Sequence, residues 1–218
     1  MLLTIGGVIG LLLLVAVAAC SSTPAFYRDR LSRQDGPAAA QARRLLSKMS
    51  ALHADMGRPG RWEAAVTETE INAWLATDLS ANHASVLPAG WSEPRVELTP
   101  HRCRVGVRIA RGPWNSVLSI DARIQLREVN QVWVTLDDAR LGVVPLPHGP
   151  ILGWLATRLS GLGMLPQSRR LDGRTVLVVY ISRNGDAGAA TSLWLEALAV
   201  GPGELLLSGE TRVAAGSR

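Results

Sequence analysis

The chain has 218 residues, of which 47% are hydrophobic, and a formal net charge of +5. This length and hydrophobicity exclude a disordered chain and allow a hydrophobic core that is stable without disulfide bonds. Lys48 is the only lysine, and the arginines are scattered among apolar residues without a nucleic-acid-binding motif, so we expect no nucleic acid partner.

The first nineteen residues are apolar or small apart from Thr4, and no charged side chain precedes Arg28. As a helix rising about 1.5 Å per residue, they would nearly span a bilayer core. The segment ends in VAAC followed by two serines, which resembles a bacterial lipobox, where the cysteine (here Cys20) is lipidated. Lipidation of Cys20, an uncleaved transmembrane anchor and a cleaved secretion signal are open alternatives for residues 1–20. Each places the protein at or near a membrane, and the lipobox-like ending favours a bacterial cell envelope with the body on the extracytoplasmic side.

Residues 21–36 contain Ser, Thr, Pro and Gly and are predicted to be a polar tether. Residues 37–60 are predicted to hold an amphipathic helix with Pro37 at its first position and Gly57 after its last. Its apolar residues recur every three or four positions and are Ala42, Leu45, Met49, Leu52 and Met56. We expect this helix to pack on its own domain.

Residues 61–213 are predicted to form one α+β domain that opens with a short strand, RWEAAVT. Thr67, with Glu70 three residues later, forms a capping box that starts the next helix. One face of that helix carries Ile71, Trp74, Leu75 and Leu79. The segment LPAGWSEP, residues 87–94, is expected to be a loop.

Two long segments then alternate apolar and polar residues, RCRVGVRIA and WNSVLSIDARIQLREV. This period of two is typical of strands with one dry and one wet face. The dry face of the second segment carries Leu118, Ile120, Ile124 and Leu126. The chain turns at VNQV and returns as VWVTLDDARLGVV, giving an antiparallel pair. Strands of about ten residues exceed the typical ~5–6, and long strands with one apolar face curl, so we expect a helix on the concave side.

That helix is predicted to start at Pro150 and to stop at the glycines and proline that follow it. Ile151, Leu155, Leu159 and Leu162 line one face with Trp154 beside them, while the preceding prolines fix where the strand ends. Three strands close the domain, RTVLVVYIS, SLWLEALAV and LLLSGETRV, the last two joined by a GPG turn. Helices and strands do not alternate as βαβ units, so we predict α+β with an antiparallel sheet.

No GxSxG, HExxH, P-loop or GxGxxG motif is present. Asp137 and Asp138 are adjacent, and neighbours on a strand point to opposite faces, so we expect no catalytic dyad there. His101 and Cys103 are too few ligands for a metal. The sequence therefore predicts no enzyme, no cofactor and no metal site.

Three stretches carry a family resemblance. VTETEINAWLA (66–76), LGVVPLPHGPILGWL (141–155) and LEALAVGPGELLLSGETRV (195–213) resemble, in order, segments of the YpmS-like membrane-anchored proteins and related envelope lipoproteins. These look similar to tubular lipid-binding (TULIP-like) domains. The resemblance covers about residues 61–213 and implies a long, curved antiparallel sheet wrapped around two or three helices, with an apolar groove for acyl chains. It supplies no catalytic residue.

We therefore expect a membrane-tethered, non-catalytic protein that binds a lipid or another hydrophobic ligand in an apolar groove. The alternative is a structural or protein-interaction module of the envelope with a solid core and no ligand. The expected partners are the membrane, through residues 1–20, a lipid or fatty-acyl ligand, and an envelope protein. The predicted groove residues are Ile71, Trp74, Leu75, Leu79, Leu118, Ile120, Ile124, Leu126, Leu152, Trp154, Leu155 and Leu159.

Overall fold

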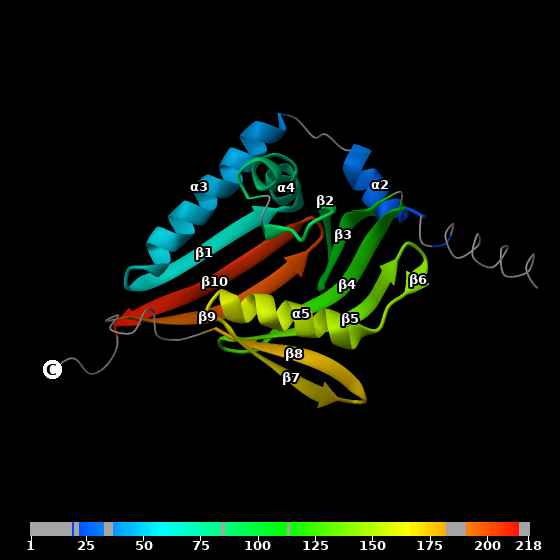
Figure 1. Ribbon diagram of the computed structural model, residues 1–218. Helices are drawn as coiled ribbons and strands as arrows, with labels where there is room; N and C mark the ends of the chain where they lie inside the picture. Colours follow the sequence, from blue (N-terminus) through cyan, green and yellow to red (C-terminus); the bar gives the residue numbers. More distant parts are fainter. Residues whose placement is uncertain are drawn as a thin grey trace, which may run out of the picture.

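The computed structural model describes residues 19, 22–32, 37–83, 86–112, 114–181 and 191–213. Within these residues, helices α2–α5 and strands β1–β10 form an α+β fold with two antiparallel sheets (Figure 1). The predicted class and the large antiparallel sheet are confirmed. The proposed lipidation site, Cys20, and nearly all of the predicted signal or anchor lie outside the described residues.

The larger sheet has the order β2-β3-β4-β5-β8-β7, with β6 attached to β5. Its strands are β2 (Trp91–Thr99), β3 (Arg102–Arg111), β4 (Trp114–Glu128), β5 (Gln131–Leu141), β6 (Val144–Pro145), β7 (Leu165–Leu171) and β8 (Arg174–Tyr180). The predicted hairpin is the β4–β5 pair, and its strands of 15 and 11 residues are as long as expected.

The smaller sheet has the order β1-β10-β9, formed by β1 (Gly60–Thr67), β10 (Glu204–Val213) and β9 (Thr191–Gly201). The buried side chain of Asn130, in the β4–β5 turn, joins it to the larger sheet by donating to the Leu193 carbonyl at 2.7 Å and accepting from the Leu195 N–H. Asn130 adopts a positive φ of 64°, a conformation that asparagine tolerates better than most residues.

The helices begin close to the predicted positions. The first, α3 (Ala38–Met56), is preceded by Pro37, which is the N-cap rather than the first helical residue. The helix predicted to begin at Pro150 is α5 (His148–Gly161), and it begins two residues earlier because Pro147 is its N-cap. Pro150 lies in the first turn, where a missing N–H leaves no helical hydrogen bond unmade.

Three strands were not predicted from the sequence, and one of them is the two-residue β6, where the chain turns back onto β5 after Leu141. β2 includes part of the expected loop 87–94, and its apolar alternation is interrupted by Pro94, where the register against β3 shifts. β7 has the sequence LPQSRRL, and its polar residues reflect an exposed edge position with little apolar surface to bury. Edge strands and bulges obscure the period of two on which sequence-based prediction depends.

The expected tether at 21–36 contains α2 (Ala25–Ser32), which lies against the larger sheet. Tyr27 is 0% exposed, and its hydroxyl donates to the Glu93 carbonyl at 2.7 Å. The ring lies over Gly106, where an added Cβ would come within 2.5 Å of the Tyr27 Cδ2. The glycine therefore makes room for a docked helix, and this part of the chain is not a free linker.

The apolar core consists of two clusters on one continuous surface. The first lies between α5 and strands β4, β5 and β8, and centres on Leu152 and Leu177. The second lies between α3 and the smaller sheet, and centres on Leu52 and Trp62. Val132 of β5 packs against both clusters, so the dry faces of the two sheets meet there.

Candidate functional site

The apolar face of β3 and β4 is covered less completely than the region under α5. α5 packs against β5, β7 and β8 and, in the first cluster, against Ile120 and Ala122 of β4, whereas β3 lies beyond β4 in the strand order. Val107 pairs across the strands with Leu118, and Val105 pairs with Ile120, so these four side chains share one face. Val105 and Ile120 are only half-buried.

Two tryptophans reach across this face from opposite sides. Trp91, at the start of β2, and Trp154, on α5, have ring centroids 6.0 Å apart. Three strand spacings of about 4.8 Å separate β2 from β5, so the paired rings bridge about 14 Å over the dry faces of β3 and β4. Trp154 is still 44% exposed.

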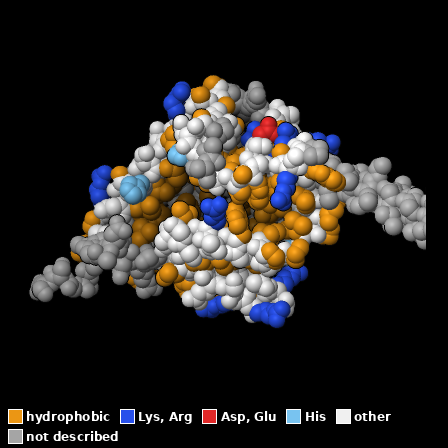
Figure 2. Space-filling model, in the orientation of Figure 1, with side chains coloured by type: hydrophobic (Ala, Val, Ile, Leu, Met, Phe, Trp, Pro, Cys, Tyr) orange, Lys and Arg blue, Asp and Glu red, His pale blue; other side chains and the backbone are white. Residues whose placement is uncertain are grey.

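We call the hollow on this face the apolar trough. Its floor is the dry side of β3 and β4, and its boundaries are α5 and the tryptophan pair. In Figure 2, hydrophobic side chains gather on the face beside α5, partly over the smaller sheet between α3 and α5 and partly to the right of it, over the larger sheet. The trough residues that remain at least partly exposed are Trp91, Val105, Ile120, Ile124, Leu126, Ile151, Trp154 and Leu155, and the buried Val107 and Leu118 complete the floor.

Eight of the twelve predicted groove residues lie in or beside the trough. Ile120, Leu152, Leu155 and Leu159 belong to the cluster under α5. Leu126 packs against the second cluster, near α3. Leu118 is buried and Ile124 half-buried, both on the dry face of β4, and Trp154 contacts Trp91.

The other four, on α4 (Glu68–Asn82), are not brought to α5. α4 packs against α3, β1 and β2. Leu79 is buried, while Ile71, Trp74 and Leu75 are half-buried, and the Trp74 indole donates to Asp78 at 2.8 Å. These residues therefore contribute to a separate part of the molecule.

The role of α4 is visible at the edge of β2. The Asn72 amide donates to the Val96 carbonyl at 2.7 Å and accepts from the Val96 N–H at 2.8 Å. The Glu68 carboxylate accepts from the Leu98 N–H at 2.7 Å. These side chains occupy the hydrogen-bonding positions that a further strand would use, which closes this edge of the larger sheet.

The start of α4 is fixed by the predicted capping box between Thr67 and Glu70, which is confirmed. Burial alone disfavours the charged Glu70 carboxylate, but hydrogen bonds from Lys48 and Thr67 outweigh it. Together with the Lys48 charge, they hold the pKa of Glu70 below its ordinary value. The Lys48 ammonium lies 2.8 Å from the carboxylate, so α3 and α4 are joined by an ion pair.

The opposite face of the larger sheet carries charges, and a β-bulge brings both members of the acidic pair onto it. Asp121 of β4 pairs with Asp138, but the next residue of β4 pairs with Leu136, which leaves Asp137 as an extra residue. Arg102 Nη1 lies 3.2 Å from Asp137 Oδ2 and 3.5 Å from Asp121 Oδ2, while Asp138 and Asp121 line one pocket. The expectation that Asp137 and Asp138 point to opposite faces is wrong, because a bulge interrupts the alternation.

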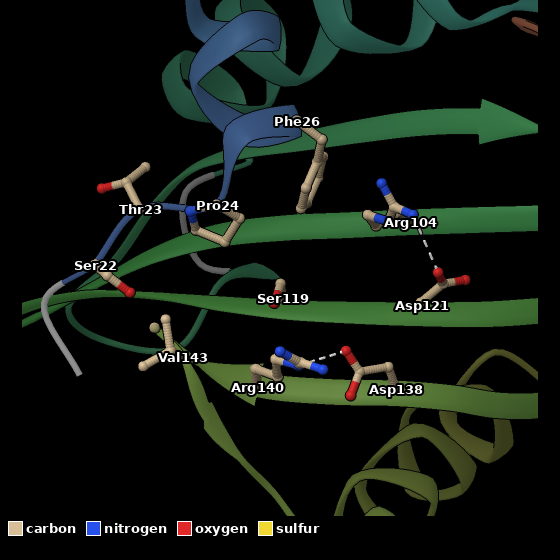
Figure 3. Close-up of a pocket in the computed structure, with 11 residues that line it drawn as sticks. Ser22, Thr23, Pro24, Phe26, Arg104, Ser119, Asp121, Asp138, Arg140 and Val143 are labelled. Atoms are coloured by element: carbon tan, nitrogen blue, oxygen red, sulfur yellow. Dashed lines mark hydrogen bonds and ion pairs between the residues drawn. The ribbon is translucent and has the colours of Figure 1, made fainter. Parts of the chain in front are cut away.

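This polar pocket has a volume of about 350 Å³ and lies beside the start of α2 (Figure 3). Each of its carboxylates faces a guanidinium, with Arg140 Nε 2.7 Å from Asp138 Oδ2 and Arg104 Nη2 3.3 Å from Asp121 Oδ2. The ring of Phe26 lies 5.1 Å from the Arg104 guanidinium carbon. The paired charges compensate each other, although Asp121 Oδ1 is buried without a hydrogen-bond partner among the described residues.

A larger cleft of about 920 Å³ lies between α2, α4 and β2. Its lining is mixed, with Arg30, Glu68, Asn72 and Arg95 among apolar neighbours. Arg30 Nε lies 2.6 Å from Glu68 Oε1, and its Nη2 lies 3.2 Å from Glu97 Oε1. These ion pairs tie α2 to α4 and β2 across one end of the cleft.

Cys103 and His101, the two side chains weighed as metal ligands, differ in environment. Cys103 is a half-buried free thiol on β3, and desolvation, with Asp121 and Glu68 nearby, raises its pKa to about 11. His101 lies exposed in the β2–β3 turn with a positive φ of 62°. No three His, Cys, Asp or Glu side chains converge as a metal site in the part of the chain that the structure describes.

Among the described residues, the helices are too short or too polar for any of them to cross a bilayer. The chain matches no family model, no curated protein and no solved structure.

Proposed function

We propose that this protein is a membrane-tethered, non-catalytic module of the bacterial cell envelope that binds a lipid or another hydrophobic ligand in the apolar trough. One observation carries the proposal. On the dry face of β3 and β4, Val105, Ile120 and Ile124 remain half-buried beside α5, and Trp91 and Trp154 meet on the same side of the sheet.

The physical argument concerns surface that is not yet withdrawn from water. Complete burial of a Leu or Ile side chain contributes roughly 1.5–3 kcal/mol relative to its exposure. Half-buried residues such as Ile120, Ile124 and Leu155 still expose part of their apolar surface to water. A bound acyl chain would bury that surface and so gain the remaining part of this free energy. The tryptophans offer flat apolar rings on which such a chain could lie.

The membrane part of the proposal comes from the N-terminus and from the resemblance to YpmS-like and TULIP-like proteins. Residues 1–19 are apolar enough in sequence to enter a bilayer, and the VAAC ending supports lipidation of Cys20, with the body on the extracytoplasmic side. Intact-mass analysis of membrane-extracted protein tests this. An unmodified chain that retains residues 1–19 leaves the uncleaved anchor.

A second candidate function is a protein-interaction module with a solid core. The region under α5 favours it, because Leu152 is 1% exposed and Leu177 is 0% exposed. That part of the sheet is packed to completion and leaves no space for a ligand. The two candidate functions therefore make different predictions for the half-buried surface beside α5: it binds a ligand in the first and is the margin of a solid core in the second.

Leu155→Trp in the full chain tests the proposal. The residue is half-buried at the boundary between α5 and the trough. The matched control is Thr157→Trp, which places the same ring on the exposed side of α5. Protein in amphipol is titrated with a fluorescent fatty acid, and its stability is measured by denaturant unfolding.

If the trough holds the ligand, Leu155→Trp weakens fatty-acid binding about tenfold or more and changes stability little, and Thr157→Trp changes neither. If the surface is the margin of a packed core, the added bulk costs roughly 1–3 kcal/mol of stability. A destabilised Leu155→Trp, together with a wild-type chain that binds neither fatty acid nor phospholipid, refutes the trough and favours the interaction module.

A further inference from the structure

The N-terminal end of the described chain is attached to one end of the larger sheet. The Val143 N–H, in the β5–β6 turn, donates to the Ala19 carbonyl at 3.0 Å, and Ser22 Oγ donates to the same carbonyl at 3.2 Å. A few residues later, Tyr27 is fully buried. The chain is thus held at both Ala19 and Tyr27, and Figure 1 shows α2 lying at the end of the sheet where β6 turns.

The β3–β4 turn lies at this same end. The Gly142 N–H donates to the Val117 carbonyl at 2.8 Å, which places the β5–β6 turn beside the first residues of β4. Trp114 is three residues before Val117 and pairs with Arg111 across the turn. Trp114 is 51% exposed and Val143 is 54% exposed, so large apolar side chains project from the end where the chain enters the body.

In the two turns at this end, the only charged side chains are those of Arg111 and Arg140. Residues 110–116 and 139–147 contain no Asp or Glu. Arg111 is exposed and forms no ion pair with any described residue, and Arg140 pairs with Asp138. A tryptophan with an unpaired arginine beside it suits the bilayer interface, where the ring lies at headgroup level and the guanidinium meets lipid phosphates.

We propose that the tip formed by Arg111, Trp114 and Val143 rests on the bilayer surface, with Trp114 among the lipid headgroups. The partner is a lipid surface with anionic phosphates. This inference rests on the uncleaved-anchor form of the proposed tether, because it takes residues 1–18 into the bilayer and needs Ala19, which cleavage before a lipidated Cys20 would remove. Since Ala19 is bonded to the tip, the body has one orientation, with β4 pointing away from the membrane.

The orientation has a consequence for the trough. Leu118, at the near end of its floor, is four residues from Trp114, or about 14 Å along β4. The trough therefore begins close to the lipid surface, within reach of an acyl chain that leaves the bilayer. The far end of β4, at Glu128, lies about 45 Å from Trp114 along the strand.

Site-specific fluorescence in the full chain tests the tip. The chain carries Cys20→Ser, which retains residues 1–19 as an anchor, and one cysteine introduced as Trp114→Cys or, in a second variant, Val143→Cys. The matched control is Val129→Cys, also an exposed apolar turn residue but at the opposite end of β4. Cys103 is half-buried, and its raised pKa keeps it protonated near neutral pH, so it takes up label slowly there. Each variant is labelled with an environment-sensitive dye and reconstituted into phosphatidylcholine–phosphatidylglycerol vesicles with or without brominated lipid.

We expect brominated lipid to quench the dye at positions 114 and 143 at least twofold more than at position 129, and Arg111→Glu to reduce that difference. A chain that floats with the vesicles but shows equal quenching at all three positions overturns the tip while leaving the tether intact. Shielding at 114 that depends on protein density rather than on brominated lipid also overturns it, because it assigns the tip to a protein contact. A chain that does not float refutes the tether itself, and with it this orientation.

Discussion

Docking of α2 depends on Tyr27, and its loss should free this helix without unfolding the sheet. Tyr27→Phe removes only the hydroxyl that donates to the Glu93 carbonyl, a hydrogen bond of about 0.5–1.5 kcal/mol. Tyr27→Ala removes a fully buried ring, and such changes cost about 3–5 kcal/mol in protein cores. Since α2 is a short element at one face, the loss of global stability cannot exceed the free energy with which α2 docks.

Hydrogen exchange measured by mass spectrometry on residues 22–32 reports this docking directly. A free energy of 1.4 kcal/mol corresponds to a tenfold change in an equilibrium constant, so Tyr27→Phe should speed exchange about tenfold or less. Tyr27→Ala should speed it about 100-fold or more, up to the rate of undocked α2. Phe26→Ala is the matched control, because this neighbouring ring is only half-buried against Arg104.

Unchanged exchange of α2 in Tyr27→Ala would show that the helix is not held by this ring. Exchange that rises equally in α2 and in the centre of β4 would show that the change acts on global stability. Either result would remove the structural basis for a body held in one orientation against the membrane.

Three further changes test the regions around α4 and β3. Asn72→Ala leaves the N–H and carbonyl of Val96 without partners at the edge of β2, and we expect a loss of about 1–3 kcal/mol in thermal unfolding, with Asn72→Asp retaining only the acceptor contact. Glu70→Gln removes the charge paired with Lys48 and should cost about 1 kcal/mol at pH 7. The pKa of this carboxyl is lower in the folded chain than its unfolded value of about 4.5. Its stabilising contribution is therefore present above pH 4.5 and is lost as the pH falls through the folded pKa. The free energies of unfolding of the variant and the wild type, measured in denaturant, should become equal in acid. Peptide mapping after thiol labelling at pH 8 should find Cys103 modified much more slowly in the folded chain than after unfolding, and equal rates would contradict its raised pKa.

The sequence by itself determined the elements whose signals are local. The capping box at Thr67 and Glu70 involves residues three apart, and the alternation in β4 continues through a strand of 15 residues. The α+β class and the antiparallel hairpins follow from such patterns, because burial of one face dictates a period of two or 3.6. The same patterns identified the halves of the candidate trough that come from β4 and α5.

Only the tertiary structure decided how distant segments meet. The bulge that brings Asp137 and Asp138 to one face results from the register between β4 and β5, and the Trp91–Trp154 contact joins segments more than sixty residues apart. The apolar face of α4 carries the same kind of residues as α5, yet Asn72 attaches α4 to the edge of β2, away from the trough. Tyr27 lies in a polar stretch that the sequence predicts to be a tether. Its ring is buried because Gly106, on the distant strand β3, has no side chain to occupy that space. Hydrophobic periodicity states which side of an element is buried, but which partner buries it depends on pairing and packing that no local pattern encodes.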